Sequence, residues 1–97
     1  MSAFASNQSI TSIAERVGNQ LLQKKAKITT AESCTGGGIA EAITATAGSS
    51  QWFEYGYITY ANIAKKQLLN VSQKTLDAYG AVSEQVVEQM AVGAIHS

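Results

Sequence analysis

The stretch Ile28-Thr29-Thr30-Ala31-Glu32-Ser33-Cys34-Thr35-Gly36-Gly37-Gly38 decides the fold of this 97-residue chain. A β-branched run opens it, and an Ala- and Ile-rich helical pattern starts at Ile39, directly after it. A strand that turns through glycines into a helix directs unpaired backbone N–H groups out of the helix N-terminus. Such a turn binds anions, including a phosphate, a carboxylate or a developing oxyanion. The stretch therefore predicts an α/β fold and a candidate site together.

Upstream of this stretch, residues 10–24 have the three- and four-residue spacing of a helix with one buried face. Its apolar positions are Ile10, Ile13, Ala14, Val17, Leu21 and Leu22. We expect Ser9 or Thr11 to be the N-cap of this helix. Residues 1–9 are polar and are expected to form a flexible lead-in.

Downstream, residues 37–47 fit a second helix that Gly48 ends. Its inward-facing residues are expected to be Ile39, Ala40 and Ile43. Trp52 and Phe53, after a Gly-Ser-Ser turn, are expected to form a hydrophobic anchor. Residues 55–60 are rich in aromatic and β-branched side chains, which favours a second strand after the one predicted over residues 28–31.

Three more helices are predicted after the second strand, and each has a polar residue at its start. Asn62 caps the first, Ser72 caps the second and Ser83 caps the third, while Gly80 ends the second. The last helix has a continuous apolar face made of Val86, Val87, Met90, Ala91, Ala94 and Ile95.

Strands separated by helices predict a layered α/β/α domain in which helices pack on a sheet. Two strands make a poor sheet, since three or more are usually needed for independent stability. The sheet is therefore expected to be incomplete in this chain. A larger domain or a partner chain would supply the missing strands.

Composition limits the classes of function. The chain is 45% apolar and 14% charged, as is ordinary for a folded soluble domain. Seven acidic and seven basic side chains cancel, so no net field favours a nucleic acid or an anionic membrane as partner. A single cysteine, Cys34, excludes an internal disulfide and a multi-cysteine zinc site. Without a secretory segment or a membrane-length apolar run, a cytoplasmic location is expected.

Ser33 and Cys34 are the candidate nucleophiles of the glycine-rich turn. A serine needs a neighbouring base, whereas a cysteine can be activated at a helix N-terminus alone. The only histidine, His96, is expected to lie exposed at the C-terminus of the last helix. A lysine is then the remaining base, because Ser–Lys pairs carry out acyl transfer on unrelated folds. Lys65 and Lys66 are candidates, although spacing alone is more typical of solvated lysines.

Four sequence blocks help to choose among these candidate nucleophiles and bases. They are TTAESCTGG, AGSSQWF, GYITYANIAKKQLLNV and AVSEQVVEQMAVGAI, in this order. The glycine-rich block alone is weak evidence, but the ordered set resembles the amidohydrolase domain of the CinA/PncC family, the nicotinamide-nucleotide amidases. The resemblance covers the chain from Ile10 onward but only about the first three-fifths of the family domain.

The resemblance implies a catalytic set of Ser33 as nucleophile, Lys65 as base and Tyr60 close to both. It implies substrate-binding roles for Glu32, Thr35, Gly36, Gly37 and Asn62. Backbone N–H groups of the glycines would stabilise the oxyanion, and Cys34 would be a small buried neighbour of the nucleophile.

The implied reaction is hydrolysis of the carboxamide of nicotinamide mononucleotide (NMN) to nicotinate mononucleotide and ammonia. The implied partner is this small-molecule substrate, without a nucleic acid, a membrane, a metal or a cofactor. A homo-oligomer is compatible with the resemblance.

The family pattern continues into a second glycine-rich loop of the type SGIAGP and into strands that carry a substrate-contacting arginine, which this sequence lacks. Residues 10–97 are therefore interpreted as a partial amidase domain of weak or no activity by itself. The alternative is a non-catalytic remnant that associates with a partner through its last helix and second strand. A phosphate-binding module is least favoured, because the turn lacks the spacing and lysine of a P-loop.

Overall fold

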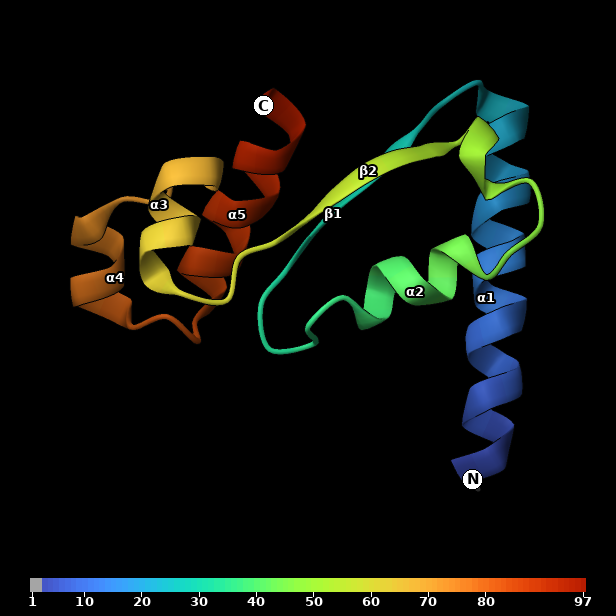
Figure 1. Ribbon diagram of the computed structural model, residues 1–97, viewed down its shortest axis with the longest axis horizontal. Helices are drawn as coiled ribbons and strands as arrows, with labels where there is room; N and C mark the ends of the chain where they lie inside the picture. Colours follow the sequence, from blue (N-terminus) through green and yellow to red (C-terminus); the bar gives the residue numbers. More distant parts are fainter. Residues whose placement is uncertain (1–2) are drawn as a thin grey trace. The chain divides into compact units, whose positions relative to one another are not determined.

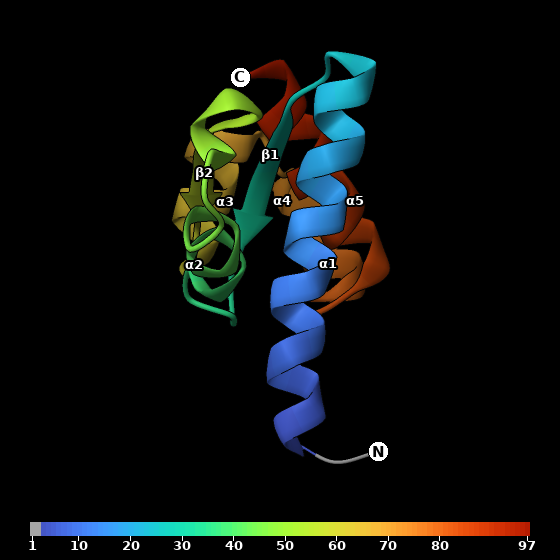
Figure 2. The same ribbon diagram turned by 90° about the vertical axis from the view of Figure 1, so that its right-hand side faces the viewer.

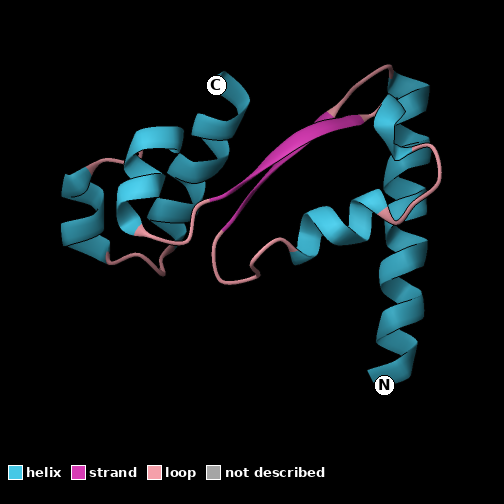
Figure 3. Ribbon diagram, viewed as in Figure 1, coloured by secondary structure: helices cyan, strands magenta, loops and turns pink. Residues whose placement is uncertain are grey.

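The structure is a computed structural model that describes residues 3–97, with side chains described from Ser9 onward. Along this range five α-helices, one short 3-10 helix and two β-strands follow one another (Figures 1 and 3). They are α1 (Ala3–Lys24), β1 (Ile28–Glu32), α2 (Gly38–Thr44), η1 (Ser49–Gln51), β2 (Phe53–Ile58), α3 (Asn62–Leu69), α4 (Gln73–Tyr79) and α5 (Glu84–His96). This order of elements confirms the predicted α/β class.

The two strands form one sheet, and they run parallel. Ile28 N–H, at the start of β1, donates to Trp52 O just before β2. At the other end, Thr59 N–H donates to Glu32 O, 2.8 Å away. Both predicted strands are therefore confirmed, and the sheet has two strands in the described residues. Strand β2 begins and ends two residues earlier than predicted, which places Tyr60 after the strand rather than in it.

The chain divides into two compact units, each with its own packing. The first unit consists of Met1–Ile28 and Gly38–Tyr55, and the second of Thr29–Gly37 and Gly56–Ser97. The glycine-rich turn and the elements after β2 therefore fold within the same unit.

In the first unit, Trp52 is the buried anchor. It packs against α1 at Gly18, where a Cβ atom would lie 2.7 Å from the indole ring. Helix α1, seen along its length in Figure 2, is followed by a left-handed residue, Lys25, with φ 53°. Ala26 N–H donates to Leu21 O at 2.9 Å, which is the hydrogen bond of a Schellman motif. The predicted anchor at Trp52 is confirmed.

Helix α1 starts earlier than the spacing predicted. Residues 3–9, expected to be an irregular lead-in, already belong to α1, so Ser9 and Thr11 lie inside the helix and are not its N-caps. Among residues 9–24 of the helix, Ala14 and Gly18 are buried, whereas Ile10 and Ile13 are exposed. The predicted apolar face is therefore buried only toward its middle, where Trp52 packs.

Helix α2 ends at Thr44, three residues before the predicted end. The Thr44 hydroxyl donates to Ala40 O at 2.9 Å, and such back-bonding by a β-branched residue competes with helix continuation. Gly48, with φ 79°, precedes η1 instead of ending α2. Of the predicted inward-facing residues, Ile43 is buried and Ile39 is exposed, since two helical turns bury only a narrow stripe.

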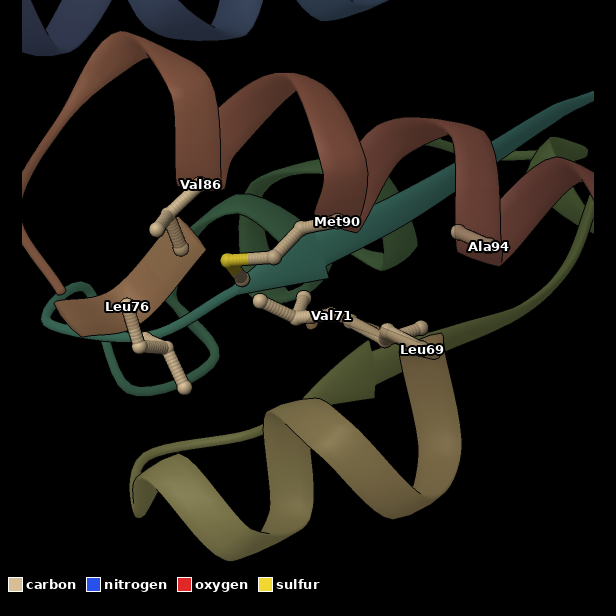
Figure 4. Packing of buried hydrophobic residues seen from close by; sticks show 6 residues of the cluster. All are labelled: Leu69, Val71, Leu76, Val86, Met90 and Ala94. Carbon is tan, nitrogen blue, oxygen red and sulfur yellow. The ribbon is translucent and has the colours of Figure 1, made fainter. Parts of the chain in front are cut away.

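The second unit contains the larger hydrophobic cluster, to which α3, α4 and α5 contribute (Figure 4). Its buried residues are Leu69, Val71, Leu76, Val86, Met90 and Ala94. Helices α3 and α5 approach each other closely at Gly93, where a Cβ atom would lie 1.9 Å from Leu69 O. Only glycine fits this crossing.

Three N-caps were predicted for the helices of the second unit, and two of them are confirmed. Ser72 Oγ accepts from Thr75 N–H at 3.1 Å, and Ser83 Oγ accepts from Val86 N–H at 3.2 Å. The prediction for Asn62 is wrong, because Ala61 is the N-cap of α3 and its carbonyl accepts from Lys65 N–H. Asn62 is the first residue inside the helix.

The predicted apolar face of α5 is split. Val86, Met90 and Ala94 are buried in the cluster, whereas Val87 and Ile95 are 62% and 70% exposed. Residues four apart along a helix lie on one stripe, so one stripe is covered and its neighbour faces outward. None of the helices in residues 3–97 combines the length and the apolar character that crossing a bilayer requires.

Candidate functional site

The glycine loop, defined here as residues 33–37, connects β1 to α2 and lies in the second unit. Gly36 and Gly37 have φ angles of 61° and 106°, a region that side chains with a Cβ atom rarely adopt. At Gly37 a Cβ atom would also lie 3.0 Å from Ile58 Cδ1. The glycines are therefore required by the path of the backbone.

Glu32, the last residue of β1, holds the loop from inside. Its side chain is buried, with 2% of the residue exposed. Oε1 accepts a 2.7 Å hydrogen bond from Thr35 Oγ1 and a 3.2 Å hydrogen bond from Gly37 N–H. The carboxylate thus contacts two of the residues that were predicted, with it, to bind substrate.

Ser33 is partly buried at the first position of the glycine loop, and its carbonyl accepts from Gly36 N–H at 3.0 Å. Cys34 is exposed, so the prediction of a buried neighbour of the nucleophile is wrong. The side chain that turns toward the buried Glu32 is that of Thr35, one residue later, whose hydroxyl donates to Oε1 although Thr35 itself is exposed.

Two of the backbone N–H groups predicted to stabilise the oxyanion already have hydrogen-bond partners within the loop. Gly36 N–H donates to Ser33 O, and Gly37 N–H donates to the carboxylate of Glu32. A donor that already has a partner at close range is poorly placed to stabilise a charge on substrate. In this conformation, neither N–H group points freely at a ligand.

Lys65 is buried, with 3% of the residue exposed, and its Nζ donates to Tyr60 O at 2.9 Å. Lys65 and the core residue Leu69 are four residues apart and share the inward stripe of α3. The neighbouring Lys66 is partly exposed and donates to Gln73 Oε1. Spacing alone predicted that both lysines are solvated. Lys66 is solvated only in part, and Lys65 is not solvated.

Tyr60 and Asn62 lie next to Lys65 in the chain but face outward. Tyr60 is 76% exposed, and it contacts Lys65 through its backbone carbonyl. Asn62 is exposed at the start of α3. In the described part of the chain, the hydrogen bond of Lys65 Nζ goes to Tyr60 O, and none joins it to Ser33 Oγ.

Two buried hydroxyl groups were not singled out from the sequence. Thr30 Oγ1 in β1 and Thr59 Oγ1 after β2 have no hydrogen-bond partner among the described residues. Buried polar atoms are nearly always paired, so these two mark an unusual region of the second unit. The sequence contained no signal for them, because threonine in a strand is ordinarily read as a β-former.

His96 is exposed in the last turn of α5, as predicted. Among residues 9–97, whose side chains are described, no three His, Cys, Asp or Glu side chains gather where they could hold a metal ion.

Comparison with known sequences gives a consistent family. The family model described as the CinA C-terminal domain matches residues 10–97. A nicotinamide-nucleotide amidohydrolase PncC from Enterobacter agglomerans is 52% identical over 92 residues, which cover 95% of this chain and 56% of the relative. The PncC protein of Escherichia coli K12 is 54% identical over 83 residues, 86% of this chain and 50% of the relative. The chain spans about half the length of the curated relatives it matches.

Solved structures agree with the sequences. A competence-damaged protein (CinA) superfamily protein from Escherichia coli matches with a TM-score of 0.88 and 39% identity, over 90% of this chain and 51% of that one. The competence/damage inducible protein CihA from Agrobacterium tumefaciens matches with a TM-score of 0.87 and 45% identity, over 90% of this chain and 53% of that one. With this fold, the glycine loop and the match of the family model, the chain belongs to the CinA C-terminal domain family.

Proposed function

We propose that residues 10–97 form the part of a nicotinamide-nucleotide amidohydrolase domain that carries the nucleophile and the base. The observation that carries this proposal is the 52–55% identity to relatives named nicotinamide-nucleotide amidohydrolase PncC, which extends over both the glycine loop and α3. The burial of Lys65 in the unit that contains Ser33 supports it. The protein acts in the cytoplasm on a small-molecule nicotinamide nucleotide.

The reaction starts with Ser33 Oγ attacking the carboxamide carbon of NMN, while the Oγ proton passes to Lys65 Nζ. The tetrahedral intermediate then collapses, the carbon–nitrogen bond breaks, and Lys65 returns the proton to the departing nitrogen to release ammonia. Water attacks the resulting ester, and Lys65 takes its proton. The bond between the acyl carbon and Ser33 Oγ then breaks, and Lys65 returns the proton to Oγ, which frees Ser33 and releases nicotinate mononucleotide.

Exposed groups around these two residues are assigned to the substrate. Tyr60 has a solvent-facing phenol that donates to the oxyanion, in place of the engaged N–H groups of Gly36 and Gly37. Asn62 and Gly36 are exposed and contact the nucleotide. These assignments follow the resemblance of the sequence blocks to the family.

The 97 residues alone are expected to turn NMN over slowly or not at all. They span about half the length of the amidohydrolase relatives. Catalysis needs the amide held in near-attack geometry, and a displacement of about 1 Å can cost on the order of a hundredfold in rate. Nothing in the described residues is assigned to hold the phosphate end of NMN.

The test is incubation of the purified chain with NMN, with ammonia measured enzymatically and nicotinate mononucleotide measured by mass spectrometry. Any turnover must disappear in Ser33→Ala and persist in the matched loop variant Cys34→Ala. Release of ammonia by Ser33→Ala at the wild-type rate would contradict the assigned nucleophile.

A second candidate function is a non-catalytic chain that associates with a partner. The observation that favours it is the exposed apolar stripe of α5, on which Val87 and Ile95 lie. Association that survives Ser33→Ala but is lost in Val87→Gln/Ile95→Gln, without any turnover of NMN, would support this function.

A further inference from the structure

We propose that Glu32 is a positioning residue that fixes the glycine loop through Thr35, and that neither side chain binds substrate. The inference rests on the proposed function, because its consequence is the placement of the nucleophile Ser33. It assigns to Glu32 and Thr35 a role different from the substrate contact that the resemblance implied.

The first argument is the environment of the carboxylate. Only 2% of Glu32 is exposed, so a substrate cannot reach it without opening the loop. A buried carboxylate is costly unless donors compensate it, and Oε1 has two, the Thr35 hydroxyl and the Gly37 N–H group. Hydrogen bonds to an ionised acceptor are also stronger than those between neutral groups.

The second argument is the spacing of the donors. Thr35 and Gly37 lie three and five residues after Glu32, so the two hydrogen bonds close the chain back onto the residue that precedes Ser33. Gly36 N–H closes a smaller ring onto Ser33 O, and Thr59 N–H ties Glu32 O to the segment after β2. Ser33 is therefore held on both sides by residues of the same unit.

The third argument is the chemistry of the substrate. NMN carries a phosphate, which a carboxylate repels, and a cationic pyridinium ring, which is too large to reach the buried carboxylate of Glu32. The Thr35 hydroxyl donates its only proton to Glu32, so it has none to offer to a phosphate or to a carbonyl oxygen. Glu32 and Thr35 are therefore suited to hold the loop together. The hydrogen bonds from Thr35 Oγ1 and Gly37 N–H to Glu32 Oε1 are called the clamp below.

The experiment compares Thr35→Val, which removes the donor at nearly constant volume, with Thr35→Ser, which keeps it. Thr44→Val is the matched control, because its hydroxyl donates to Ala40 O outside this loop. The first readout is hydrogen exchange of the Gly37 amide by NMR in the 97-residue chain. We expect exchange about tenfold faster in Thr35→Val and in Glu32→Gln, and unchanged in Thr35→Ser and Thr44→Val.

The second readout is the rate at which a fluorophosphonate labels Ser33. We expect labelling about tenfold slower in Thr35→Val, with the wild-type rate rescued in Thr35→Ser. Ser33 should be labelled no more slowly in the double variant Glu32→Gln/Thr35→Val than in the slower single variant, because both substitutions disrupt the same hydrogen bond. Circular dichroism of each variant shows whether it is folded.

The outcomes separate the two proposals. Unchanged Gly37 exchange in both Glu32→Gln and Thr35→Val would overturn the clamp, whatever the activity of the chain. If wild-type Ser33 is not labelled at all while Gly37 exchange responds as expected, the clamp stands and the proposed nucleophile fails.

Discussion

Lys65 and Lys66 are neighbours in the sequence with different surroundings in the structure. Lys65 is buried and donates to a backbone carbonyl, whereas Lys66 is partly exposed and donates to the side chain of Gln73. Which of the two lysines is buried depends on which side of α3 faces the hydrophobic cluster. That side is set by tertiary contacts, such as the packing of Leu69 in the cluster. Helical spacing could not have distinguished the two lysines, although the resemblance to the family did.

This difference leads to a prediction for activity. In any form of the protein that turns NMN over, Lys65→Met should lower kcat by about a thousandfold, because the proton acceptor of Ser33 is lost. Lys66→Met, the matched variant one residue later, should stay within about twofold of wild type. Steady-state measurement of ammonia release checks both. Equal losses in the two variants would argue against Lys65 as the base.

A second prediction at the residue scale concerns stability. Gly93→Ala should lower the free energy of unfolding by about 1–3 kcal/mol or more, because its Cβ atom would lie 1.9 Å from Leu69 O and helices α3 and α5 would have to separate. The matched control is Gly38→Ala at the start of α2, where a Cβ atom has open space. This control should be neutral or more stable by up to about 1 kcal/mol. Urea titration of both variants checks the pair, and equal stabilities would contradict the close crossing.

At the scale of elements, local rules predicted the starts of α4 and α5 and failed at α3. Ser72 and Ser83 bond to the backbone N–H group three residues ahead, which is a short-range interaction that sequence reading can find. At α3 the helix begins one residue earlier, with Ala61 as N-cap, because the path of the chain after β2 sets the start. Local rules also failed at the end of α2, which lies at Thr44, earlier than predicted.

The cap of α5 can be tested by itself. Ser83→Ala removes the hydrogen bonds that Ser83 makes to Val86 N–H and to Gly80 O, and should destabilise the chain by about 1 kcal/mol. Ser83→Asp keeps an acceptor at the N-cap and should retain most of the stability. Urea unfolding followed by far-UV circular dichroism provides the measurement. A Ser83→Ala midpoint equal to that of wild type would show that the cap contributes nothing.

At the scale of the whole molecule, the sequence predicted an α/β fold with an incomplete sheet, and the structure contains a two-stranded one. The glycine loop was predictable because Gly36 and Gly37 need φ angles that only glycine readily adopts. The burial of Glu32 and the unpaired hydroxyl groups of Thr30 and Thr59 were not, because each depends on contacts between segments far apart in sequence.

The length of the relatives leads to a prediction for a joined protein that spans their whole length. Joining residues 1–97 to the second half of the Pseudomonas putida PncC relative, which is 55% identical over 85 residues and 53% covered by this chain, should raise ammonia release from NMN at least about a hundredfold above that of the 97 residues alone. The gain comes from holding the substrate in attack geometry.

The same joined protein with Ser33→Ala serves as the control and should be inactive. Full activity of the 97 residues alone would show that the first half of the domain already contains everything the reaction needs.

The packing of Trp52 against Gly18 makes the first unit optically distinct. Trp52 is the only tryptophan of the chain, and its indole is buried in that unit, so its emission reports the integrity of the α1–η1 packing and little else. Far-UV ellipticity, in contrast, sums the helices of both units. If the units unfold together, the two signals will give one urea midpoint, and a separation of the midpoints will reveal two cooperative blocks. In the case of separate midpoints, Gly93→Ala should move the ellipticity curve and leave the fluorescence curve in place, because Gly93 lies in the second unit and Trp52 in the first.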